Sequence, residues 1–63
     1  MMTYQERVLD EHRELLDKTQ KLIEFTESYK FKTLDIVDAK LLNDQLNCML
    51  NYLHILKQRI ARF

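Results

Sequence analysis

The side chains with the clearest capacity for chemistry are the cations near the C-terminal end of the sequence. Lys57, Arg59 and Arg62 lie close together in the chain, and guanidinium groups bind phosphate through paired N–H donors. An antiparallel partner helix would bring Tyr4 and Arg7 to the same end, adding an aromatic ring on which a base could stack. Complementarity to the helix dipole also accounts for cations at this position. The pattern therefore indicates either an anion site or a stabilised helix terminus.

An uncharged polar line runs toward these cations. The stretch 45–56 contains no Asp, Glu, Lys or Arg, although 32% of the chain is charged. Asn43, Asn47 and Asn51 are spaced by four, so they form one line on a helix, which His54 continues. This line could be solvated, could meet its copy in another subunit as a buried Asn does in coiled coils, or could contact a polar ligand. The candidate ligand-binding residues are Tyr4, Arg7, Asn47, Asn51, His54, Lys57, Arg59 and Arg62.

Signatures of catalysis are absent from the sequence. The chain has no glycine, which excludes P-loop and Rossmann phosphate-binding turns. Ser28 is the only serine, and Cys48 is not placed on a helix to pair with His54 as nucleophile and base. A metal site from His12, His54 and Asp10 is conceivable, but the spacing is generic. We predict that the protein is not an enzyme and holds no metal or cofactor.

A first helix is expected over about residues 4–29. Thr3 and Glu6 have capping-box spacing, and apolar pairs then recur every seven residues, the period of a supercoiled helix. The half-turn positions of this repeat are His12, Thr19 and Thr26, which we expect to bond a backbone carbonyl or a neighbour across the seam, or to face a wet groove.

The turn is expected at about residues 30–34, and a second helix from about residue 35 to residue 62. Thr33 or Asp35 can cap the second helix, while Phe31 and Leu34 close that end of the bundle. A second apolar line lies beside the seam of this helix, so the apolar arc spans roughly 160°, more than one partner helix covers. The seam is Ala39, Leu42, Leu46, Met49, Leu53, Leu56, Ile60 and Phe63. The candidate subunit interface is Leu41, Asn43, Cys48, Tyr52 and Ile55.

The size of the chain favours self-association. Sixty-three residues form a single domain, 1–63, and such small chains need a disulfide, a metal or partner subunits. Cys48 is the only cysteine, so no disulfide forms within the chain; we expect a small buried apolar group in a reducing compartment. We expect no signal peptide and no membrane-spanning run. The expected architecture is all-α: an antiparallel two-helix hairpin that assembles into a homo-oligomeric bundle, dimeric or larger.

Charge is balanced over the chain but not along it. Residues 1–29 carry four basic and seven acidic side chains, a net −3, and residues 30–63 carry six basic and three acidic, a net +3. Helices of opposite net charge attract each other when they pack side by side. Zero net charge argues against a general nucleic-acid binder.

Three segments carry a family resemblance: ERVLDEHRELLDKTQKLIEF, then ES with Phe31 and Leu34, then LLNDQLNCMLNYLHILKQRI. They resemble small tailed-phage and prophage proteins named as related to a crAss-like phage protein, over nearly the whole chain. The resemblance implies a phage product acting in the bacterial host cytoplasm. More distantly, the hairpin is similar in design to the anti-CBASS sponges, helical oligomers that trap cyclic nucleotides between subunits. The sponge sequences do not align with this chain residue by residue, so no binding residues are assigned from them.

Two functions follow as hypotheses. The first is a non-enzymatic phage binding protein with an anti-defence role, which sequesters a cyclic nucleotide or other phosphorylated messenger at subunit interfaces. The second is a helical module that inhibits or scaffolds a host protein through the wide apolar face of the second helix. The number of subunits, the ligand and the host target are not fixed by the sequence.

Overall fold

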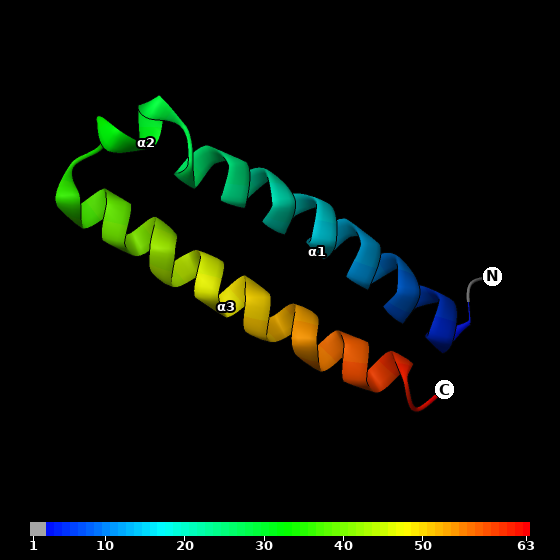
Figure 1. Cartoon of the computed structure of the whole chain (residues 1–63). Helices are drawn as coiled ribbons and strands as arrows, with labels where there is room; N and C mark the ends of the chain where they lie inside the picture. The colour runs from blue at the N-terminus through cyan, green and yellow to red at the C-terminus, as the bar shows by residue number, and fades with distance from the viewer. Residues whose placement is uncertain (1–2) are drawn as a thin grey trace.

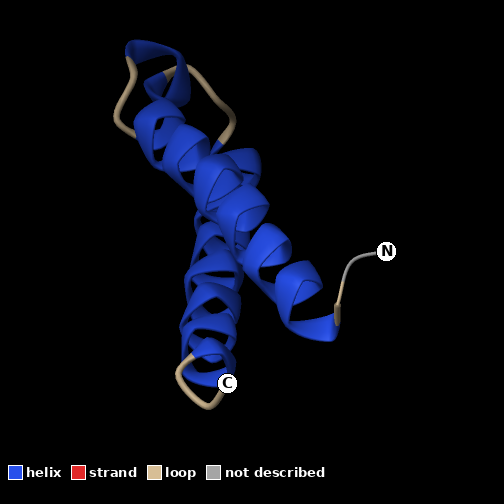
Figure 2. Ribbon diagram, turned by 90° about the vertical axis from the view of Figure 1, so that its right-hand side faces the viewer, coloured by secondary structure: helices blue, strands red, loops and turns tan. Residues whose placement is uncertain are grey.

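The computed structural model describes residues 3–63 as two long antiparallel helices joined by a short helical corner (Figure 1). Helix α1 spans Tyr4–Thr26, α2 spans Tyr29–Lys32 and α3 spans Ile36–Ile60. The molecule is elongated, with principal extents of 44 × 18 × 15 Å. Figure 2 shows the two long helices crossing at an angle. The predicted all-α fold is confirmed.

Both long helices begin at the caps that the sequence predicts. The Glu6 backbone N–H donates to the Thr3 hydroxyl oxygen at 3.1 Å, and the Thr3 hydroxyl donates to the Glu6 carboxylate at 3.2 Å. At the start of α3, the Val37 backbone N–H donates to the Asp35 carboxylate at 3.0 Å. Each cap satisfies a backbone donor that has no partner inside the helix.

The corner differs from the expected simple turn. Helix α1 ends at Thr26 rather than near residue 29, and α2 occupies part of the predicted turn. Side-chain hydroxyls bond to the carbonyls of the last turn, since Thr26 donates to the Ile23 carbonyl at 2.7 Å and Ser28 donates to the Phe25 carbonyl at 2.6 Å. The Phe25 and Phe31 rings meet edge to face, 6.2 Å apart, so Phe31 closes this end of the hairpin.

The core within one chain is small. Among residues 3–63, only Val8, Thr19 and Leu56 are buried. The predicted seam of α3 is otherwise half-buried, except that Phe63 is 45% exposed. Cys48 is exposed, so the expectation of a buried thiol is wrong for the single chain. Two long helices that face each other along one seam leave the flanks of that seam uncovered.

The apolar runs within residues 3–63 fall short of what a bilayer-spanning helix requires.

Candidate functional site

A cluster of aromatic and cationic side chains lies where α1 begins and α3 ends. Tyr4, Gln5, Arg59, Arg62 and Phe63 line a surface pocket of about 350 Å³, called the end cluster below. The Arg59 guanidinium donates a hydrogen bond to the Tyr4 hydroxyl and lies 5.6 Å from the centre of that ring. The Tyr4 and Phe63 rings are tilted by 58°, with centres 6.3 Å apart. Antiparallel packing thus joins Tyr4 to Arg59 and Arg62, whereas Arg7 and Lys57 do not line this pocket.

The end cluster has the chemistry of an anion site beside an aromatic surface. Of the ion pairs formed among residues 3–63, none involves Arg59 or Arg62. Their guanidinium groups therefore keep N–H donors available for an external anion. The Tyr4 and Phe63 rings offer π-faces on which a planar base can stack. A ligand that carries both a phosphate and a planar ring would match both features.

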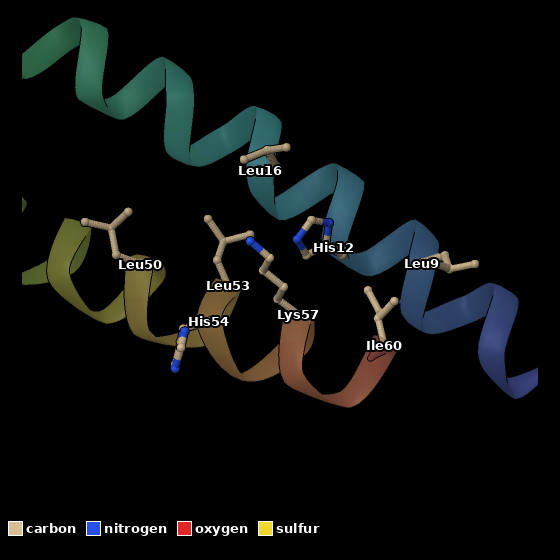
Figure 3. Close-up of a pocket in the computed structure, with 8 residues that line it drawn as sticks. All are labelled: Leu9, His12, Leu16, Leu50, Leu53, His54, Lys57 and Ile60. Carbon is tan, nitrogen blue, oxygen red and sulfur yellow. The ribbon is translucent and has the colours of Figure 1, made fainter. Parts of the chain in front are cut away.

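A larger apolar groove runs between α1 and α3. It has a volume of about 580 Å³ and is called the inter-helix groove. Figure 3 shows His12 and Lys57 extending into the space between the helices and the His54 ring turned away from α1. The groove is lined by Leu9, His12, Leu16, Leu50, Leu53, His54, Lys57 and Ile60. Its walls are mainly aliphatic, so it suits an apolar occupant.

The predicted ligand-binding residues do not form a single site within one chain. Lys57 and Arg59 are two residues apart on α3, so their side chains point about 160° apart. Lys57 and His54 line the groove, whereas Arg59 belongs to the end cluster with Tyr4 and Arg62. Three further predicted residues are exposed and line neither of these two pockets: Arg7, Asn47 and Asn51.

Some lining residues were missed from the sequence. Gln5 belongs to none of the predicted patterns, and Phe63 is the last residue of the predicted seam. The groove leucines Leu9 and Leu16 are the second members of apolar pairs that recur every seven residues. The first member of such a pair faces α3, so the second could have been recognised as the wall of a flanking groove.

The predicted subunit interface is exposed on the single chain. Leu41 is 60% exposed, Ile55 53% and Tyr52 42%, and Asn43 and Cys48 are exposed as well. None of them lines the groove or the end cluster. The apolar members Leu41, Cys48, Tyr52 and Ile55 are called the outer line below.

Metal binding finds no support in the part of the chain that the structure covers. Residues 3–63 contain no group of three or more His, Cys, Asp or Glu side chains that could hold a metal ion.

Comparison with known proteins gives a phage relative and a family. An uncharacterised 7.5 kDa protein from the denB–rIIB intergenic region of Enterobacteria phage T4 is 41% identical over 63 residues, covering 100% of this chain and 98% of that protein. This relative supports the expectation that the chain is similar to small phage proteins. Neither this relative nor the family model below identifies the crAss-like family. No solved structure matches the chain. The Sequestin family model matches residues 2–62, and the chain therefore belongs to the Sequestin family.

Proposed function

We propose that this protein sequesters a phosphorylated nucleotide messenger, such as a cyclic nucleotide, in the cytoplasm of an infected bacterium. The family name denotes sequestration and supports a binding, non-catalytic role. The observation that carries the proposal is the end cluster, where Arg59 and Arg62 stand beside the Tyr4 and Phe63 rings. Cations for a phosphate and aromatic faces for a base are the two features that nucleotide recognition needs.

The ligand in this proposal lies where copies of the chain meet. Lys57 and His54 line a different surface from Arg59 and Arg62, so a single hairpin cannot offer all these groups to one small molecule. A neighbouring copy could bring its own Lys57 or His54 to the end cluster. Arg7, Asn47 and Asn51 remain candidate contacts contributed in the same way.

Calorimetric titration tests this proposal. Cyclic dinucleotides, cyclic trinucleotides and ADP-ribose isomers would be titrated into the unaltered protein and into Arg59→Ala. For a ligand that binds, losing one charge-assisted hydrogen bond should weaken affinity by roughly 10- to 100-fold. Lys30→Ala, in α2 at the opposite end of the hairpin, is the control and should bind normally. If none of these ligands gives a binding signal with the unaltered protein, the proposal fails.

The second candidate is a module that binds a host protein. The exposed outer line favours it, because exposed apolar rows on a helix are a common recognition surface. Affinity capture from host lysate, with Ile55→Glu as the matched variant, separates the two functions. A host protein that is retained stoichiometrically, and lost with Ile55→Glu, would favour this second function.

A further inference from the structure

The single chain exposes more surface than a compact protein of its mass. Its solvent-accessible surface is 5251 Å², whereas a compact monomer of 7.7 kDa exposes about 4,300 Å². Its radius of gyration is 14.5 Å, against about 11 Å for a compact domain of this length. The surplus of about 950 Å² is close to the roughly 800 Å² that each partner buries in a standard interface. One contact with a partner would remove this excess.

The inter-helix groove is the surface best shaped for that contact. Leu9, Leu16 and Leu50 are 47%, 49% and 43% exposed along it, and both long helices contribute to its walls. A groove between two antiparallel helices accepts the side-chain ridge of a further helix. The outer line lies on α3 alone and lines neither of the two pockets described above.

We infer that a second copy of this chain packs into the inter-helix groove, so that two hairpins form a four-helix bundle. A twofold contact places the same face on both sides, and two copies of this mainly aliphatic face can bury each other. Lys57 alone bears a formal charge among the described residues that line it. Its aliphatic stem can lie against the leucines while its ammonium group reaches the rim. Because the chain has zero net charge, no overall charge repulsion opposes the association of two copies.

This contact is separate from ligand binding. It joins two copies through the inter-helix groove, and it needs no nucleotide to form. Measurement of mass without ligand tests the contact, and calorimetry tests the ligand. Failure of the inferred contact can therefore be distinguished from failure of the proposed ligand binding.

Sedimentation equilibrium without ligand is the first test. The unaltered protein should have at least twice the chain mass of 7.7 kDa. A carboxylate buried against leucines lacks a partner, so Leu16→Glu should weaken self-association by at least about 100-fold. Ile36→Glu, at a position that is 83% exposed outside the groove, is the matched control. Ile55→Glu, on the outer line, should keep at least the dimer mass. A single-chain mass for the unaltered protein, or dissociation by Ile55→Glu but not by Leu16→Glu, would overturn the inference.

A second measurement avoids variants that could fail to fold. Isotope-filtered NOEs on a mixture of labelled and unlabelled native chains report contacts between copies only. We expect intermolecular NOEs to the Leu16 and Leu50 methyl groups. Intermolecular NOEs confined to Leu41 and Ile55, or none at all, would contradict the assignment.

Discussion

At the scale of single residues, Thr19 is unusual because it is a polar side chain buried in the seam between the helices. Thr19 is 1% exposed, and its hydroxyl donates to the Leu15 carbonyl at 2.7 Å. The sequence predicts this bond, because a polar side chain in an apolar repeat can return to its own backbone. It does not predict that Thr19 would be among the most buried residues, since burial depends on what α3 places opposite it.

Replacing Thr19 with valine should stabilise the hairpin. The substitution keeps the shape and removes a hydroxyl whose acceptor belongs to the same helix. We expect Thr19→Val to raise the free energy of unfolding by about 0.5–1 kcal/mol, measured by urea denaturation. Thr19→Ser, which keeps the hydroxyl and loses a methyl group, should lower it. A loss of stability for Thr19→Val would show that the hydroxyl has a further structural role.

At the scale of elements, helix starts were predictable and the corner was not. Thr3 and Asp35 cap through short-range side-chain bonds that sequence spacing reveals. The seven-residue repeat continues past Thr26, so the pattern alone extended α1 to about residue 29. The structure ends α1 earlier, at Thr26, where the Thr26 and Ser28 hydroxyls bond to nearby carbonyls and the chain turns into α2.

The Asp35 cap gives a prediction for α3. Asp35→Ala removes the carboxylate that accepts from the Val37 backbone N–H, and it should lower the free energy of unfolding by about 1 kcal/mol. Asp35→Asn keeps a hydrogen-bond acceptor, so its free energy of unfolding should fall much less. Circular dichroism during urea denaturation compares the two. Equal losses would show that the charge at the helix terminus, rather than the capping bond, supplies the stabilisation.

At the scale of the whole molecule, the wide apolar arc of α3 was predictable, but its division between two surfaces was not. Counting residues shows that the arc exceeds one partner helix. It does not show which flank of α3 meets a flank of α1 to form a groove. The predicted ligand residues split for the same reason, since Lys57 and Arg59 fall on opposite sides of α3 once α1 is in place.

Self-association should make thermal stability depend on protein concentration. If folding is coupled to the groove contact, a tenfold increase in concentration should raise the thermal midpoint by about 3–6 °C. Scanning calorimetry over a wide range of concentrations measures this. Ile36→Glu should show the same dependence as the unaltered protein. A midpoint that stays constant with concentration would mean that the hairpin is stable as a single chain.

The start of α1 and the end of α3 lie at the same end of the hairpin (Figure 1), and Tyr4 and Phe63 both belong to the end cluster. A purification tag fused to either terminus would therefore emerge beside Arg59 and Arg62, where its side chains could compete with a bound anion. The α2 corner is at the far end of the 44 Å molecule. A tag inserted there, or a terminal tag removed by protease before titration, would leave the arginines accessible.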